Sequence, residues 1–234
     1  MKSGIITLLL VLLVWPQPAG AQDEPSQRRH QVTVGGGVGW SGPYNIGDAT
    51  AQLRGNGIGS LAPVFTLFAA RSRITPTISP ELRVGYAVTA TTAVEFSFGY
   101  ALPHVAVAIS NDPEAPAQQL PGEQLQQYLI GGAATWRIPM PPRVRARVGN
   151  RLAPFVLGGA TFLRQLHEDR TLGATGQVYY AGGGARYFLR RDAGSGRAYG
   201  LRADGRVNVR RNGIEFEDKM RLYPTVSLAA FIGF

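Results

Sequence analysis

The chain has 234 residues with 30 glycines, 16 prolines and no cysteine, a composition that favours one domain of strands and turns without disulfides. The glycines follow no three-residue period, which excludes a collagen, and the 44% of apolar residues excludes a disordered chain. The net charge of +9 comes almost wholly from arginine, since Lys2 and Lys219 are the only lysines. The arginines do not cluster on a helix, and the sequence contains no nucleic-acid-binding motif. Nucleic acid is therefore not an expected partner.

The first 21 residues have the three parts of a secretory signal peptide. Lys2 supplies the positive start, residues 5–15 form an apolar run of 11 residues, and Ala19 and Ala21 form a small-x-small cleavage site. A helix that spans a membrane needs about 20 apolar residues. We therefore expect residues 1–21 to be cleaved, leaving a short polar segment at 22–29 before the folded domain at 30–234.

Apolar residues alternate with small or polar ones along most of the remaining chain, which predicts strands. The clearest segment is residues 198–210, where Leu201 and Val207 share one face and Arg202 and Arg206 share the other. Eight strands are predicted, at residues 31–40, 80–88, 93–102, 126–138, 151–163, 177–190, 198–210 and 222–234. The alternation in residues 151–163 is too weak to assign the faces of that strand.

The predicted connections differ in length. Residues 89–92 and 191–197 are short turns, whereas residues 41–75 and 108–123 are long. The first long connection has room for a short helix or an inserted hairpin around residues 61–70. Short turns on one side and long loops on the other are expected of bacterial outer-membrane barrels, although the connection at 139–150 is longer than that rule predicts.

Lipid offers no hydrogen-bond partner, so strands cross a membrane only in a sheet that closes on itself. An arginine that faces lipid at mid-membrane costs about 2–4 kcal/mol, so the charged faces are expected to point into the lumen. Strands two and three lie roughly opposite strands six and seven in such a barrel, which places acids across the lumen from arginines. The predicted lumen charge network is Glu81, Arg83, Glu95, Arg186, Arg202, Asp204 and Arg206.

Aromatic residues lie near the ends of the predicted strands, as in the interfacial girdles of membrane barrels. A water-soluble barrel would instead carry bulky rings in the middle of its strands. The predicted interfacial aromatics are Trp40, Tyr100, Tyr128, Trp136, Tyr199 and Tyr223.

Four segments resemble the OmpA-like and OmpX-like family of small outer-membrane β-barrel domains. They are the opening strand at 31–40 (QVTVGGGVGW), residues 154–161 (PFVLGGAT), the amphipathic strand at 199–209, and the alternating end of the chain at Phe234. The resemblance covers residues 30–234. It implies an eight-stranded antiparallel up-and-down transmembrane barrel in the outer membrane, with Phe234 as the signal read by the barrel-assembly machinery and lipopolysaccharide among the surrounding lipids.

No catalytic, cofactor or metal site is predicted. Lipid A deacylases of the outer membrane use a His-x-Ser pair, and none of His30, His104 or His167 is followed by serine at that spacing. The acids after His167 are expected to form a solvated loop cluster, because three adjacent residues rarely converge on one metal ion. For the same reason, Glu215, Glu217 and Asp218 are not predicted to form a site for a divalent cation that bridges lipopolysaccharide.

These observations favour a monomeric, non-enzymatic outer-membrane barrel with a structural or surface-interaction role. Three alternatives remain open: a narrow pore, an enzyme that modifies lipid A, and a soluble periplasmic barrel of the lipocalin type.

Overall fold

The structure is a computed structural model that describes residues 29–54, 64–112, 116–148, 151–167, 173–191, 196–213 and 220–234. The predicted signal peptide and residues 22–28 lie outside the described residues, so cleavage after Ala21 stays a prediction.

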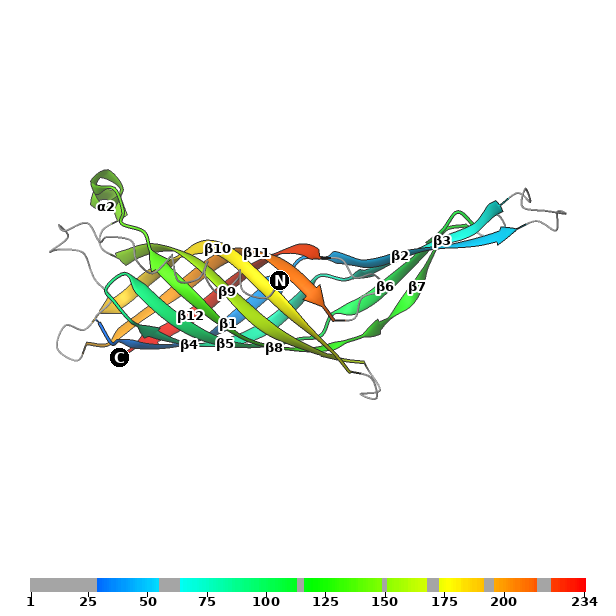
Figure 1. Cartoon of the computed structure of the whole chain (residues 1–234). Coiled ribbons are helices and arrows are strands. Elements are labelled where there is room, and N and C mark those ends of the chain that lie inside the picture. Colours follow the sequence, from blue (N-terminus) through cyan, green and yellow to red (C-terminus); the bar gives the residue numbers. More distant parts are fainter. Residues whose placement is uncertain are drawn as a thin grey trace, which may run out of the picture.

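Eight strands close into an antiparallel barrel, which confirms the predicted fold class (Figure 1). Each barrel strand pairs with the next barrel strand in the sequence, and the last strand, β12, closes the ring against the first, β1. The barrel strands are β1 Val32–Ser41, β4 Thr77–Ala87, β5 Thr92–Ala101, β8 Gln126–Arg137, β9 Leu152–Leu166, β10 Gly173–Arg191, β11 Ala198–Asn212 and β12 Arg221–Gly233. Each of the eight predicted strands overlaps one of them. Closure gives every strand a partner on both sides, so the ring has no open edge.

The outer wall of the barrel is apolar on every strand. One exposed side chain per strand illustrates this, with exposed fractions from 41% to 58%: Val38, Val84, Phe96, Ile130, Val156, Tyr179, Val207 and Leu228. On the described barrel strands, the exposed charged residues are Arg164, Arg190, Arg191 and Arg211, and each lies within two residues of a strand end. This arrangement is the reverse of a water-soluble barrel, which buries its bulky apolar side chains and exposes its charges.

Strand pairing also decides the faces of β9, which the sequence pattern left open. Phe155, Leu157 and Leu163 are buried inside the ring, whereas Val156 and Phe162 are about half exposed on the outer wall. Large side chains occupy both faces of this strand, so no simple alternation of apolar and polar residues was available in the sequence.

Glycines allow close approach between neighbouring strands at some positions of the wall and not at others. A Cβ atom on Gly184 of β10 would lie 2.1 Å from the backbone oxygen of Ala203 in β11, whereas a Cβ on Gly205 would meet nothing within 4 Å. Gly184→Ala is therefore expected to lower the free energy of unfolding by about 1–3 kcal/mol through overpacking. Gly205→Ala is expected to change it by less than about 0.5 kcal/mol. Urea unfolding of the two variants in detergent micelles measures the difference, and equal effects would contradict the packing described.

Four further strands form a second sheet that continues the barrel wall beyond one end (Figure 1). Its strands, in spatial order, are β2 Tyr44–Arg54, β3 Val64–Ile74, β6 His104–Ser110 and β7 Gln118–Gln124. We call them the projecting sheet. They occupy most of the connections predicted as long loops. For the first connection the sequence left open a short helix or an inserted hairpin around residues 61–70; β2 and β3 pair as a hairpin, over a longer range than those residues. The register of β2 against β3 shifts at Ile46 and beside Ala51, which explains why strict alternation did not reveal these strands.

The opposite end of the barrel carries the shorter turns, the end of β12 and a helix, α2 Pro142–Val148, in the connection between β8 and β9 (Figure 1). In the described part of the chain, no helix combines the length and apolar character needed to cross a membrane.

Candidate functional site: the charged core of the barrel

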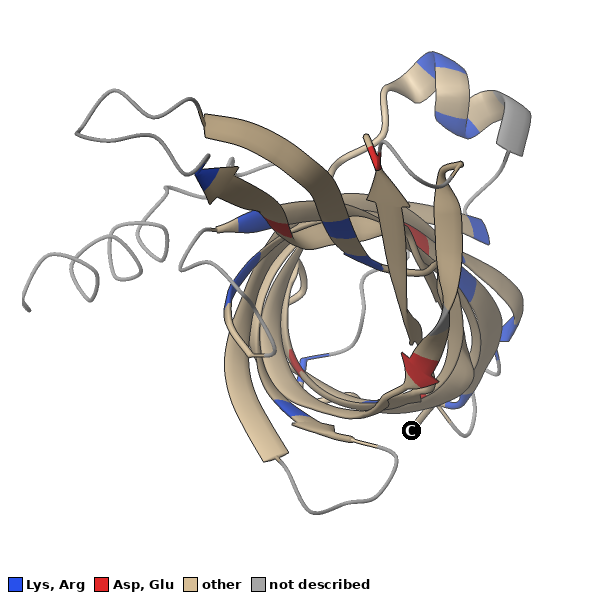
Figure 2. Ribbon diagram, turned by 90° about the vertical axis from the view of Figure 1, so that its right-hand side faces the viewer, with Lys and Arg blue, Asp and Glu red and all other residues tan. Residues whose placement is uncertain are grey.

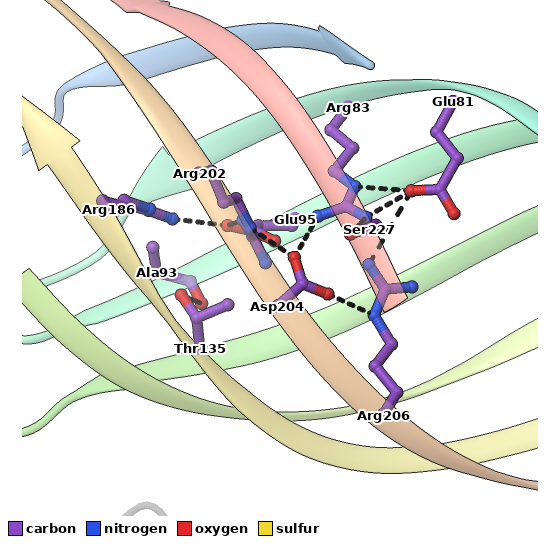
Figure 3. A network of polar contacts seen from close by, with 10 residues as sticks. All are labelled: Glu81, Arg83, Ala93, Glu95, Thr135, Arg186, Arg202, Asp204, Arg206 and Ser227. Atoms are coloured by element: carbon purple, nitrogen blue, oxygen red, sulfur yellow. Dashed lines mark hydrogen bonds and ion pairs between the residues drawn. The ribbon is translucent and has the colours of Figure 1, made fainter. Parts of the chain in front are cut away.

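The seven residues predicted to form the lumen charge network lie together inside the barrel (Figure 3). They come from β4, β5, β10 and β11, whose alternation turns every second side chain inward. None of the seven side chains is more than 15% exposed. The charged groups are therefore separated from both the outer wall and bulk water.

Asp204 lies at the centre of the network with its side chain fully buried. Its Oδ2 accepts hydrogen bonds from Arg83 Nη1 at 2.7 Å and Arg202 Nε at 2.9 Å, and its Oδ1 accepts one from Arg206 Nε at 2.7 Å. Three guanidinium groups thus share one carboxylate. Such charge-assisted bonds are about twice as strong as bonds between neutral groups.

Two glutamates extend the network on either side of Asp204. Glu95 Oε1 accepts from Arg186 Nη2 at 2.5 Å and from Arg202 Nη1 at 2.6 Å. Glu81 binds the guanidinium of Arg83, and its Oε2 lies 3.8 Å from Arg206 Nη2. Arg202 and Arg83 therefore each bridge two carboxylates, which links all seven residues into one network.

The network crosses the lumen rather than following one strand. Arg83 of β4 contacts Asp204 of β11, and Glu95 of β5 contacts Arg186 of β10. Arg83 also donates from Nη2 to Ser227 Oγ on β12 at 2.7 Å. Side chains that meet from opposite walls fill the interior expected of an eight-stranded barrel.

Aromatic rings support the guanidinium groups from the side. The Arg202 guanidinium carbon lies 4.5 Å from the centre of the Phe155 ring, and that of Arg206 lies 5.1 Å from the Tyr180 ring. The face of an aromatic ring attracts cations. This contact matters here because four arginines face only three carboxylates within the network.

The spaces left among these side chains are small. Two cavities beside the network, both lined by Arg83, Glu95 and Arg202, have volumes of about 10 and 20 Å³, each about the size that holds a single water molecule. A third cavity, lined by Glu81 and Arg206 on the side of the projecting sheet, has a volume of about 60 Å³. The charged core therefore obstructs the lumen at the level of Asp204.

A second polar cluster at the mouth of the barrel, below the projecting sheet, was missed by the sequence analysis. Arg210 is fully buried, donates from Nε to the backbone oxygen of Asn212 at 3.0 Å, and binds the Tyr44 hydroxyl and the Gln165 side chain. The Tyr44 ring stacks on Tyr223, with 4.7 Å between ring centres. The available signal was the position of Arg210 on the same face as Arg202 and Arg206, but Tyr44 fell in a predicted loop and Gln165 lay beyond the predicted strand.

Five of the six predicted interfacial aromatics face outward near strand ends. Trp40, Tyr100 and Tyr128 lie toward the projecting sheet, whereas Trp136 and Tyr199 lie toward the α2 end. The prediction for Tyr223 was wrong: this residue is only 8% exposed and points into the lumen, because the alternation of β12 puts it on the same face as Thr225 and Ser227.

The three histidines make separate contacts. His30 Nδ1 lies 2.5 Å from the Tyr86 hydroxyl, His167 Nδ1 lies 2.7 Å from Glu123 Oε1, and the backbone N–H of His104 donates to Thr75. Among the described residues, no group of three or more His, Cys, Asp or Glu side chains is placed to hold a metal ion. The acids at 168–169 and 215–218 lie outside the described residues. Phe234 is about half exposed, and its backbone N–H donates to the Val32 carbonyl.

Comparison with protein-family models gives no match, and no curated protein matches the sequence. The solved structures that the chain matches include small outer-membrane β-barrels, the architecture implied by the sequence resemblance. Neisserial surface protein A is 12% identical, with 87% of this chain and 95% of that chain covered and a TM-score of 0.48. The attachment invasion locus protein of Yersinia pestis is 10% identical (88% and 99% covered, TM-score 0.42), and OprG of Pseudomonas aeruginosa is 10% identical (90% and 98% covered, TM-score 0.46). At these values, the fold rests on the closed strand pairing of this chain.

Proposed function

We propose that the chain is an integral outer-membrane β-barrel with a closed lumen and a non-enzymatic role, acting through the projecting sheet at the cell surface. The observation that carries the proposal is the combination of an apolar outer wall on all eight strands with a charged network inside. In water this arrangement would be costly, because apolar side chains would be hydrated. In a bilayer, the same wall faces acyl chains.

The orientation follows from the lengths of the connections. Longer loops of bacterial outer-membrane barrels face the cell exterior and short turns face the periplasm. The projecting sheet therefore lies outside the cell, and the end that carries α2 lies in the periplasm. Lipopolysaccharide surrounds the outer half of the barrel, and the barrel-assembly machinery reads Phe234 during insertion of the monomer.

The projecting sheet offers two chemically different faces for an interaction. Strand register places Asp48 and Arg71 on the outer face, where they form a solvent-exposed ion pair. Phe65, Phe68 and Leu120 lie on the face that continues the lumenal side, and all three are exposed. An exposed apolar surface of this kind is typical of a site of contact with another molecule.

A non-enzymatic role is favoured over modification of lipid A by the surroundings of the histidines. His30 contacts a tyrosine and His167 contacts Glu123, and no serine follows either at the spacing that deacylases use. Unchanged lipid A mass spectra on overexpression are the result expected here.

Insertion into the outer membrane is tested by fractionation and gel migration. The folded protein should be extracted from outer membranes only by detergent and should migrate anomalously on a gel until it is heated. Recovery in the soluble periplasmic fraction would instead support a lipocalin-like barrel.

Conduction separates the closed barrel from a narrow pore. Because the charged core obstructs the lumen at Asp204, and the cavities lined by Arg83, Glu95 and Arg202 have volumes of only about 10–20 Å³, planar bilayers containing the purified protein should show no conductance steps. Conductance steps of constant amplitude, whose frequency rises with protein concentration, would favour the pore.

A further inference from the structure

The connection between β8 and β9 is longer than a turn between neighbouring barrel strands requires, and it reaches sideways from the barrel. Helix α2 stands above the wall in the side view (Figure 1) and outside the ring of strands in the end view (Figure 2). If the barrel crosses a membrane as proposed, a segment that extends sideways beyond the ring at this end lies over the lipid next to the barrel.

Side chains on this connection combine apolar and cationic groups. Ile138 and Val144 are exposed by 43% and 45%, and Arg143 is exposed between them in the chain. The first turn of α2 contains no acidic residue. Exposed apolar side chains interspersed with arginines are typical of segments that lie in the interface of a membrane.

Further arginines extend this positive charge around the same end of the barrel. We define the basic collar as Arg29, Arg143, Arg145, Arg151, Arg190 and Arg197. The acidic residues that the structure describes all lie elsewhere. Glu81, Glu95 and Asp204 lie inside the lumen, and Asp48, Asp112 and Glu123 lie at the end of the barrel that carries the projecting sheet. Along the described residues, the outward surface at the α2 end is therefore uniformly positive.

We propose that the basic collar binds the headgroups of anionic phospholipids in the periplasmic leaflet, with Ile138 and Val144 inserted at the level of the acyl chains. The inference rests on the proposed insertion of the barrel in the outer membrane. Guanidinium groups bind phosphate with two parallel hydrogen bonds, and an anionic lipid surface retains arginines beside it. The collar lies beside the outer wall, where headgroups are present at high density. This position favours lipid over an acidic protein as its partner.

Two tryptophans provide matched reporters for the two ends. Trp136 faces outward next to the collar, and Trp40 faces outward at the end of the projecting sheet. One variant carries W15F and W40F, leaving Trp136, and the other carries W15F and W136F, leaving Trp40. Each is reconstituted in symmetric vesicles of phosphatidylethanolamine and phosphatidylglycerol, in which either one lipid or the other has brominated acyl chains that quench nearby tryptophan.

Trp136 should be quenched about two- to threefold more by brominated phosphatidylglycerol than by brominated phosphatidylethanolamine, and Trp40 should show no such preference. Each arginine beside an anionic surface strengthens binding to that surface about fivefold, so R143Q with R190Q, which removes two of the six collar arginines, should clearly reduce the preference at Trp136. R71Q with R73Q, on the projecting sheet, should leave it unchanged. Migration on unheated gels verifies that each variant is folded.

Equal quenching of Trp136 by the two lipids would overturn the inference, as would the same preference at Trp40 or a preference that R143Q with R190Q leaves unchanged. Quenching of both tryptophans without a headgroup preference would leave the membrane barrel intact and remove only the collar site. If neither lipid quenched either tryptophan, the proposed insertion itself would fail, and the collar site with it.

Discussion

Asp204→Ala is expected to destabilise the barrel by about 3–5 kcal/mol, the cost typical of removing one partner from a buried ion pair. The carboxylate that is lost binds Arg83, Arg202 and Arg206, and its side chain is fully buried. Four arginines would then face two carboxylates with little water to hydrate them. Urea or guanidinium unfolding in detergent micelles, followed by tryptophan fluorescence and by migration on unheated gels, measures the loss.

Asp48→Ala is the matched control. Asp48 also pairs with an arginine, Arg71, at 3.0 Å, but both side chains are more than half exposed. Exposed pairs contribute about 0.2–1 kcal/mol, so this variant should remain close to the parent. If Asp204→Ala were as stable as Asp48→Ala, the buried network would contribute no more than a surface pair, and its assignment as the structural centre of the lumen would be wrong.

Phe96→Arg is expected to destabilise the protein by about 2–4 kcal/mol in phospholipid vesicles, because Phe96 faces outward in the middle of β5. An arginine at that position places its charge against acyl chains near mid-membrane. Reversible unfolding in vesicles measures the change, with the fraction of folded protein read from unheated gels.

Leu53→Arg provides the contrast. Leu53 is 49% exposed and Phe96 is 53% exposed, so accessibility alone does not distinguish them. Leu53 belongs to the projecting sheet, which extends beyond the barrel, and its substitution should change the stability by less than about 0.5 kcal/mol. Equal, small effects at both positions would mean that the outer wall of the barrel faces water.

The charged core shows how far alternation along a strand can predict a site. Arg202, Asp204 and Arg206 occupy every second position of β11, so their common face is fixed by the two-residue period of a strand. Which acid meets which arginine depends on the stagger of eight strands around the ring. The contact of Arg83 with Asp204 joins residues 121 positions apart, and no local pattern contains that distance.

Tyr223 and the projecting sheet mark the limits of the pattern. Tyr223 lies near the end of β12, a place typical of interfacial rings, but the two-residue period puts it on the lumenal face with Thr225 and Ser227, where its ring stacks on Tyr44. Beyond the possible hairpin in the first connection, the projecting sheet escaped prediction because register shifts interrupt its alternation, and because pairing between distant hairpins decides whether such segments are strands or loops.

By itself, the amino-acid sequence determined the number of barrel strands, the face that each of seven strands turns inward, and the concentration of charge on those faces. These properties follow from a period of two along the backbone and from the free-energy cost of placing charge in lipid, both of which act locally. Only the tertiary structure decided the faces of β9, the ion-pair partners in the lumen, the second polar cluster at Arg210 and the sideways reach of α2. Those depend on closure of the ring, which sets the register between strands and brings residues from opposite walls to the same height.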